Sequence, residues 1–135
     1  MISFTVAGAP IPQPRPRVST RGGFARAYVP SKHPVHDYRR RIADDAEVAG
    51  LTQQTEPISV CIVAVFERPA SHVTARGVVK ATAPKVPRPD VDNIAKAVLD
   101  ALGDYFDDTL VESLSVSKSY GDFAVTKIVI AGRET

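Results

Sequence analysis

The chain has 135 residues and a formal net charge of +2, a size that suits one domain with a single hydrophobic core. No apolar run approaches the roughly 20 residues that a bilayer-spanning helix needs, and the N-terminus lacks the pattern of a secretory signal. The single cysteine, Cys61, excludes an internal disulfide and favours a reducing compartment. We therefore expect one unexported, cytoplasmic domain over residues 1–135, with no membrane partner.

The small net charge hides an uneven distribution along the chain. Residues 1–41 hold eight Lys or Arg side chains against one acid, and residues 67–96 hold six against three. The segments between and after them, 42–66 and 97–135, are acidic. A polyanion would therefore contact particular segments rather than the whole surface. Ordinary surface charge is the alternative, and composition alone does not exclude it.

The first part of the chain predicts a strand followed by a basic arm. Apolar and polar residues alternate over 2–6, as is typical of a strand. The segment 8–30 has prolines at 10, 12, 14 and 16, which favour extended chain, and arginines are spread along it. We interpret it as a basic loop in which Gly22 and Gly23 permit a turn.

From about Ser31 the apolar residues follow a helical period that ends at Gly50. Ser31 is the expected N-cap, and Pro34 suits the first turn. The buried stripe is expected to contain Val35, Tyr38, Ile42, Ala46 and Ala49. On the opposite face, the expected solvent-exposed side chains are Arg39, Arg40 and Arg41.

The middle of the chain predicts a buried strand, a loop and a second helix. Residues 56–69 are apolar at both parities, as in a strand that is buried on both faces. The polar, proline-containing segment 69–89 is interpreted as a mobile basic loop. The period of 90–102 predicts a helix, which Gly103 closes.

The C-terminal part predicts two strands, over 110–120 and 123–132, joined as a hairpin at Gly121. The order of elements is then βαβαββ. This order implies a small mixed sheet of about four strands with two main helices packed on it, in a single two-layer α/β (α+β) domain.

The heptapeptide PRPDVDN, residues 87–93, places two aspartates directly before the second helix. Asp92 alone could cap that helix, but capping does not explain Asp90. In extended chain the two carboxylates would project to the same side, and a cation between them would relieve their repulsion. Mg²⁺, with Mn²⁺ as a substitute, takes oxygen ligands of this kind.

A third acid is available after the helix, where Asp107 and Asp108 precede a strand. A helix of about ten residues is about 15 Å long. The second acidic pair therefore reaches the first only if the chain folds back or if a two-fold partner supplies it. Lys96 lies four residues after Asp92 and either reaches the metal-binding region or forms a surface ion pair. Such a set suits hydrolysis of a phosphodiester.

The stretch RPDVDNIAKAVLDAL…DYFDDTLVESLSVSKSY closely resembles the RusA-type Holliday junction resolvases, small endodeoxyribonucleases of bacteria and their phages. The shared pattern is D-[apolar]-D-N-x-x-K-A-x-x-D-A-L, a short spacer and then D-D. The beginning, GAPIPQPRPRV, is similar to the proline and arginine arm of phage-type members, with Gln13 where lysine is common. The residues that match the shared pattern are Asp90, Asp92, Asn93, Lys96, Ala97, Asp100, Ala101, Leu102, Asp107 and Asp108.

The resemblance implies a bacterial or phage-encoded, Mg²⁺-dependent homodimer without a small-molecule cofactor. Such an enzyme makes paired symmetric nicks in four-way DNA junctions during recombination and repair. By position, Asp90, Asp92 and Asp108 correspond to the metal-binding acids and Lys96 to the catalytic lysine, with Asp107 the second candidate for the third acid. The side chains expected to contact branched DNA are Arg15, Arg17, Arg21, Lys85, Arg88 and Lys118.

Two other functions stay open from the sequence. One is a non-catalytic DNA-binding module, in which the acids cap the helix and pair with Arg88 and Lys85. The other is a nuclease that acts on flaps, replication forks or RNA. The histidines, His33, His36 and His72, lack metal-ligand spacing, and we interpret them as polar surface residues.

Overall fold

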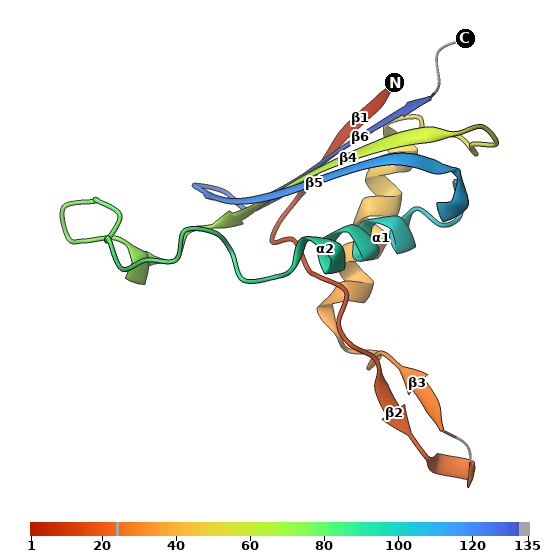
Figure 1. Cartoon of the computed structure of the whole chain (residues 1–135), viewed down its shortest axis with the longest axis horizontal. Helices are drawn as coiled ribbons and strands as arrows, with labels where there is room; N and C mark the ends of the chain where they lie inside the picture. The colour runs from red at the N-terminus through yellow and green to blue at the C-terminus, as the bar shows by residue number, and fades with distance from the viewer. Residues whose placement is uncertain (24, 133–135) are drawn as a thin grey trace.

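The computed structural model describes residues 1–23 and 25–132 (Figure 1). A four-stranded mixed sheet carries two helices on one face, and a two-stranded hairpin stands away from this body. The predicted α/β (α+β) class and the order of its six main elements are confirmed. The helices and strands are β1 (Ile2–Ala7), β2 (Arg17–Ser19), β3 (Arg26–Tyr28), α1 (Pro34–Val48), β4 (Ile58–Glu67), α2 (Val91–Ala101), β5 (Val111–Gly121) and β6 (Val125–Gly132).

The strand order in the sheet is β1-β6-β4-β5, with β4 parallel to β5 and antiparallel to β6. The predicted hairpin of the last two strands is therefore wrong, because β5 and β6 each pair with β4 and not with each other. The sequence 58–67 is the most apolar of the four strands. It takes an inner position in the sheet, where it is paired on both sides.

Only one face of β4 is fully buried, contrary to the prediction of burial on both faces. Ile58, Val60, Ile62 and Ala64 point into the core, whereas the residues between them are half-buried. Both helices lie on the same side of the sheet (Figure 1), so no helix of residues 1–23 and 25–132 covers its other side. The half-buried side chains on that side include Cys61, the free cysteine.

The core lies between the sheet and the two helices. The predicted stripe of α1 is confirmed, with Ala49 only partly buried. A hydrogen bond of 2.5 Å joins the hydroxyl groups of Tyr38 on α1 and Thr126 on β6, and both side chains are fully buried. α1 and α2 also pack on each other. No helix in the described part of the chain is long and apolar enough to cross a membrane.

The start of α1 differs from the sequence prediction. Its N-cap is His33 rather than Ser31, because the ring Nδ1 of His33 accepts a hydrogen bond of 3.1 Å from the backbone N–H of Val35. Pro34 is the first helical residue, as expected. Gly50 follows the helix with φ of 88°, a left-handed conformation that glycine adopts without strain.

The predicted exposure of the three arginines on α1 is correct only for Arg40, whose side chain is 71% exposed. Arg39 is 24% exposed because it faces Asp100 on α2 at 3.8 Å. Arg41 is 38% exposed, and it donates hydrogen bonds to the carboxylate of Asp37 and to a backbone carbonyl of β1.

Two basic segments project from the body of the molecule (Figure 1). The first, predicted as a loop, contains the β2–β3 hairpin, in which Gly22 and Gly23 adopt φ of 78° and 79°. The second, 69–89, contains a 3-10 turn at Ala70–His72 and a tight turn that closes with a 2.9 Å hydrogen bond from the Gly77 N–H to the Thr74 carbonyl. Its mobility stays a prediction.

Candidate metal and DNA-binding site

The N-terminal end of α2 presents two exposed carboxylates, those of Asp90 and Asp92. Asp90 is the N-cap residue, yet its side chain makes no capping hydrogen bond. Asp92 lies in the first turn and accepts a 3.0 Å hydrogen bond from the backbone N–H of Asn93. Asp92 is therefore not the N-cap residue, although its carboxylate does accept a hydrogen bond from one backbone N–H of the first turn, as the capping alternative allowed. The positive end of the helix dipole favours both negative charges at this position.

The assumption of an extended chain over both acids is also wrong, because α2 begins at Val91, between them. The backbone of Asp90 is extended, whereas Asp92 is helical. The alternation rule of strands therefore does not decide how their carboxylates are oriented. What the structure establishes is that both acids lie at the same end of α2 and that both face solvent.

Three segments meet at this end of α2. The backbone N–H of Gln13, at the start of the basic arm, donates a 2.9 Å hydrogen bond to the Asn93 carbonyl. The ammonium of Lys118 on β5 donates a 2.8 Å hydrogen bond to the carbonyl of Pro89. The arm, the end of the 69–89 loop and the edge strand of the sheet are thus tied to the turn that carries Asp90.

Asp107 and Asp108 lie after the other end of α2. Asp107 caps a 3-10 turn over Asp108–Leu110, and its Oδ1 accepts a 2.9 Å hydrogen bond from the backbone N–H of Thr109. Hydrogen bonds from Thr109 lower the pKa of Asp107. Among the described residues, the carboxylate of Asp108 has no hydrogen-bond or ion-pair partner. Asp108 is therefore the acid of this pair that remains free to bind a ligand.

The structure does not bring Asp108 next to Asp90 and Asp92 within one chain. α2 has 11 residues, which at 1.5 Å per residue is about 16 Å. Asp107 and Asp108 line a shallow pocket of about 380 Å³ at the C-terminal end of this helix, with Leu99, Asp100, Gly103 and Phe106. In the described residues, no group of three His, Cys, Asp or Glu side chains is arranged to hold a metal ion.

The lysine on α2, Lys96, turns toward the C-terminal end of the helix. Its ammonium lies 3.4 Å from Asp100, one turn further on, and the side chain is 62% exposed. The other oxygen of Asp100 faces Arg39 of α1 at 3.8 Å. Arg39 in turn donates a 3.0 Å hydrogen bond to Nδ1 of His36. The sequence pattern included Asp100, but the contribution of Arg39 was missed because it comes from another helix.

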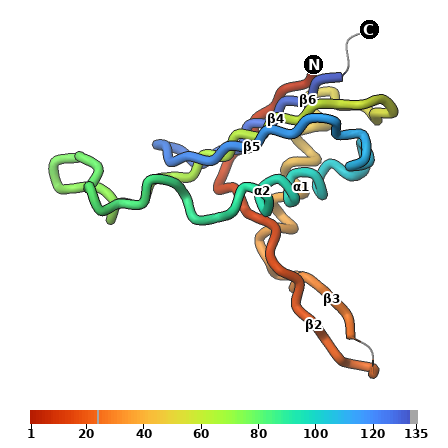
Figure 2. Tube along the Cα trace, viewed as in Figure 1, coloured from red at the N-terminus to blue at the C-terminus, as the bar shows by residue number. Residues whose placement is uncertain are grey.

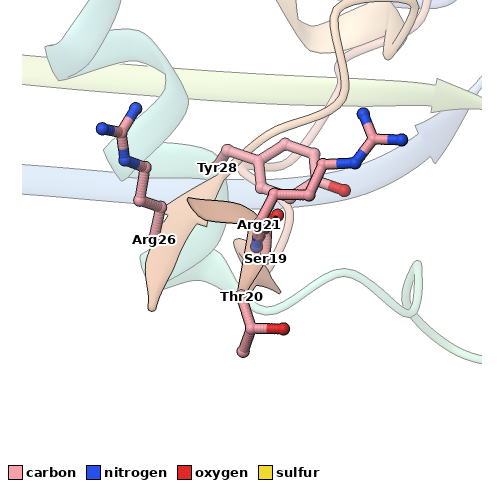
Figure 3. A pocket seen from close by; sticks show the side chains of 5 residues that line it. All are labelled: Ser19, Thr20, Arg21, Arg26 and Tyr28. Carbon is pink, nitrogen blue, oxygen red and sulfur yellow. Dashed lines mark hydrogen bonds between the residues drawn. The ribbon is translucent and has the colours of Figure 1, made fainter. Parts of the chain in front are cut away.

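The predicted DNA-contacting arginines of the arm are all exposed. Arg17 lies in β2, and Arg21 lies in the 3-10 turn at the tip of the hairpin. Figure 3 shows the guanidinium groups of Arg21 and Arg26 pointing away from each other. These two side chains, together with Ser19, Thr20 and Tyr28, line an open hollow of about 510 Å³. The tip can therefore present positive charge in more than one direction.

The predicted basic residues near α2 differ in solvent exposure and in hydrogen bonding. Lys85 and Arg88 are exposed. Lys118 is half-buried, and one of its three ammonium donors is engaged by the Pro89 carbonyl. All three lie on segments that approach the N-terminal end of α2, so this end combines acidic side chains with nearby cations.

Sequence reasoning missed an aromatic and basic cluster beside this region. The guanidinium of Arg68 lies 4.6 Å from the centre of the Tyr120 ring, and the ring of His72 meets the same ring edge-on at 5.3 Å. In the described part of the chain, Arg68 Nη1 and His72 Nδ1 are buried without a hydrogen-bond partner. The interpretation of the histidines as surface residues is wrong for His72, and His33 and His36 are also only partly exposed. No spacing in the sequence signals this contact, because Tyr120 lies on a different strand.

Two comparisons relate nearly the whole chain to known proteins. The family model described as "Endodeoxyribonuclease RusA" matches residues 7–131. This range includes the arm, both acidic pairs and Lys96. The protein YqaN of Bacillus subtilis (strain 168), described as uncharacterized, is 31% identical over 140 residues, which cover 96% of this chain and 94% of YqaN. The chain therefore belongs to the RusA endodeoxyribonuclease family.

Proposed function

We propose that the protein is a Mg²⁺-dependent endodeoxyribonuclease that cuts four-way DNA junctions as a homodimer. The observation that carries this proposal is the pair of acids at the N-terminal end of α2, Asp90 and Asp92. The carboxylate of Asp90 makes no capping hydrogen bond, and both carboxylates face solvent between two projecting basic segments. Family membership supports the cleavage of DNA, and the resemblance to junction resolvases supports the branched substrate.

The donor set of the proposed site fits a hard divalent cation. Asp90, Asp92 and Asp108 would supply carboxylate oxygens, the ligands that Mg²⁺ and Mn²⁺ take. A metal bound there lowers the pKa of an attacking water and neutralises charge on the phosphate. Asp108 is favoured over Asp107 because one oxygen of Asp107 already accepts a hydrogen bond from the N–H of Thr109.

We propose that the third acid of each site is Asp108 of the partner subunit. Within one chain, Asp108 follows the opposite end of α2 from Asp90. A two-fold axis that places two copies of α2 side by side and antiparallel would bring the C-terminal end of one helix to the N-terminal end of the other. One dimer would then contain two equivalent sites, as paired nicks in a symmetric junction require.

The remaining polar side chains would bind and orient the DNA. Arg15, Arg17 and Arg21 would contact backbone phosphates, which gives affinity without reading the base sequence. The exposed ammonium of Lys96 would leave Asp100 and stabilise negative charge on the phosphate that is cut. Its position four residues after Asp92 keeps it within reach of the proposed metal ligands.

The test is cleavage of a synthetic four-way junction with Mg²⁺, with Mn²⁺ and with EDTA. Linear duplexes of the same arm sequences are the substrate control. Asp90→Asn should lower the cleavage rate by more than about a hundredfold, since even second-shell groups of metal sites contribute up to that much. Asp44→Asn, an exposed substitution on α1, is the matched control and should cleave like the wild type.

The binding of the junction is measured separately, in EDTA, so that cleavage cannot interfere. Asp90→Asn should retain binding, because the arginines of the arm are unchanged. A wild-type protein that binds the junction but cuts no DNA with either metal ion would contradict the proposal and identify a non-catalytic module. Equal cutting of the junction, flaps and linear duplex would contradict the proposed substrate.

A further inference from the structure

The β2–β3 hairpin contributes little to the hydrophobic core. Figure 2 shows it standing away from the sheet and from the two helices. None of the described residues from 15 to 28 belongs to the core, and all of them except Ser19 are exposed. An isolated two-stranded hairpin is at best marginally stable in water. The hairpin is therefore better explained as a surface that binds another molecule than as a support for the fold.

The charge of the hairpin indicates which kind of molecule it binds. Residues 15–28 contain four arginines and no acid. In the described part of the chain, none of these arginines forms a salt bridge with a carboxylate. The fork of N–H donors on a guanidinium group matches two oxygens of one phosphate. A nucleic acid, in which phosphates repeat at a regular spacing, fits such a surface.

The shape of the hairpin distinguishes between the two grooves of DNA. A two-stranded ribbon fits the major groove of B-DNA, which is about 12 Å wide, whereas the minor groove is only about 6 Å wide. Figure 3 shows the guanidinium groups of Arg21 and Arg26 pointing away from each other. Side chains that diverge in this way can reach the phosphates of the two strands that border one groove.

One face of the ribbon carries small apolar side chains. Val18 is 69% exposed, and its partner in the register is Ala27, which is also exposed. Because paired residues project to the same face, the two side chains lie together on it. Small apolar side chains contact the methyl groups of thymine, which line the floor of the major groove. This face is therefore suited to the floor of that groove.

Both ends of the arm are tied to the body of the molecule, which fixes the place from which the hairpin projects. The backbone N–H of Gln13 donates a 2.9 Å hydrogen bond to the Asn93 carbonyl. The carbonyl of Pro30 accepts hydrogen bonds of 3.0 Å from the backbone N–H of His33 and from Nε2 of His36. The hairpin therefore leaves the body beside the N-terminal end of α2, where the candidate metal ligands lie.

The length of the arm limits how far along a duplex the hairpin can bind. The nine positions from Gln13 to Gly22 span at most about 30 Å, at about 3.3 Å per residue. At about 3.4 Å per base pair, this distance corresponds to about nine base pairs. One turn of the duplex has about 10 base pairs. The hairpin therefore reaches the groove only within the first turn from the end of α2.

We propose that the β2–β3 hairpin binds in the major groove of duplex DNA, within one helical turn of the cut. Arg21 and Arg26 contact phosphates on opposite sides of the groove, and Val18 and Ala27 face its floor. The position relative to the cut rests on the function proposed above. Binding in the groove rests on the shape, charge and exposure of the hairpin, and it is tested without measuring cleavage.

The first test uses four-way junctions in which one groove is filled while every phosphate stays in place. Bulky glucosyl groups on 5-hydroxymethylcytosine fill the major groove, and alkyl groups on N2 of guanine fill the minor groove. Each group is placed either within about 10 base pairs of the branch point, which is one turn, or further out. Fluorescence anisotropy in EDTA measures the affinity of the wild type for each junction.

Major-groove groups within one turn of the branch point should weaken binding at least about tenfold, and the same groups further out should have no effect. Minor-groove groups should leave the affinity unchanged at both places. Equal affinity for the unmodified junction and for the junction with major-groove groups near the branch point would overturn the inference, because contacts with phosphates alone do not sense the groove. Equal affinity for duplex RNA would also overturn it, because the major groove of RNA is too deep and narrow.

The second test changes the hairpin and keeps the DNA unmodified. Arg26→Ala should lower the affinity at least about fivefold, and Val18→Asp should lower it because it brings a negative charge to the floor of the groove. Arg40→Ala, on α1 and 71% exposed, is the matched control and should bind like the wild type. Circular dichroism verifies that each variant is folded. Hairpin variants that bind as tightly as Arg40→Ala would contradict the inference.

These results separate groove binding from the proposed function. A wild type that loses affinity when the major groove is filled, but cuts no DNA with either metal ion, would support groove binding and contradict the nuclease. A wild type that binds and cuts junctions equally well with and without the major-groove groups would support the nuclease and contradict groove binding.

Discussion

The buried hydrogen bond between Tyr38 and Thr126 should be a strong link between the helical layer and the sheet. It joins α1 to β6 over 2.5 Å, and both side chains are fully buried. Tyr38→Phe removes the phenolic hydroxyl without removing the ring. The hydroxyl of Thr126 then loses its partner in a place that water does not reach.

The expected loss of stability follows from a difference between removing one partner of a buried hydrogen bond and removing both. Leaving one buried polar group without a partner costs about 1–3 kcal/mol, whereas removing both partners can be nearly neutral. Tyr38→Phe and Thr126→Val should therefore each lower the free energy of unfolding by about 1–3 kcal/mol. The double variant should lose less than the sum of the two, with a coupling energy of at least about 1 kcal/mol.

The assay is urea unfolding followed by circular dichroism, for the wild type and the three variants. All four are measured at one protomer concentration, because the proposed dimer would make the apparent stability depend on concentration. Additive losses, within about 0.3–0.5 kcal/mol, would refute the reasoning that the two hydroxyl groups depend on each other.

The same tyrosine gives a pH dependence of stability. Burial raises the pKa of Tyr38 above its usual 10.0, although the Thr126 hydrogen bond and the charge of Arg41 act in the opposite direction. Between the unfolded and folded pKa, the folded state holds more protons, so stability is full below pH 10 and falls as the pH rises further. Tyr38→Phe should remove this loss of stability at alkaline pH, which urea unfolding at a series of pH values above 10 would measure. If the free energy of unfolding of the wild type fell no more steeply with pH than that of the variant, the prediction would be contradicted.

Two further predictions concern the DNA-binding arm and the second acidic pair. Arg15→Ala and Arg17→Ala should each weaken junction binding and reduce the slope of log K against log salt by about 1. Arg40→Ala, the exposed control, should change neither the affinity nor the slope. Equal slopes for the wild type and the two arm variants in salt titrations would count against phosphate contacts. Asp108→Asn should abolish metal-dependent cleavage. Asp107→Asn should retain cleavage and remove only the cap of a turn, which should lower the free energy of unfolding in urea by about 0.5–2 kcal/mol. The reverse pattern would assign the metal ligand to Asp107.

Local patterns in the sequence were sufficient for the elements of the fold but not for the pairing of its last two strands. The helical periodicity between Ser31 and Gly50 and over 90–102 predicted both helices, which the structure places at Pro34–Val48 and Val91–Ala101. Such periodicity can be recognised in the sequence because the residues of one helix face lie three or four positions apart. The connection after Gly121 looked like a hairpin, yet β6 lies beyond β4 in the sheet. Strand order depends on which strand takes an inner position, and this depends on contacts between segments that are distant in the chain.

In the candidate site, too, the features within one element could be predicted from the sequence, and the contacts between elements could not. The motif singled out Asp90, Asp92 and Lys96 as candidates; Asp92 and Lys96 lie in α2, and Asp90 is its N-cap residue. The motif could not place Asp108, because that requires the path of the chain after the helix. The partial burial of Arg39 was missed because its partner, Asp100, belongs to the other helix. Interactions within one helix can be predicted from the spacing of residues in the sequence. Interactions between two helices can be predicted only when the way the helices pack on each other is known.

The central claim is that each site combines Asp90 and Asp92 of one subunit with Asp108 of the other. Its most direct test is the co-expression of Asp90→Asn and Asp108→Asn chains with different affinity tags, followed by junction cleavage with Mg²⁺. Each variant alone should be inactive. In the mixed dimer, one site has both substitutions and the other has none.

Mixed dimers purified through both tags should therefore cut one strand of the junction at about half the wild-type rate of nicking, because one of two symmetric sites is intact. Native mass spectrometry verifies that both chains are present. Mixed dimers that are as inactive as either variant alone would show that the three acids must come from one chain, and would contradict the account.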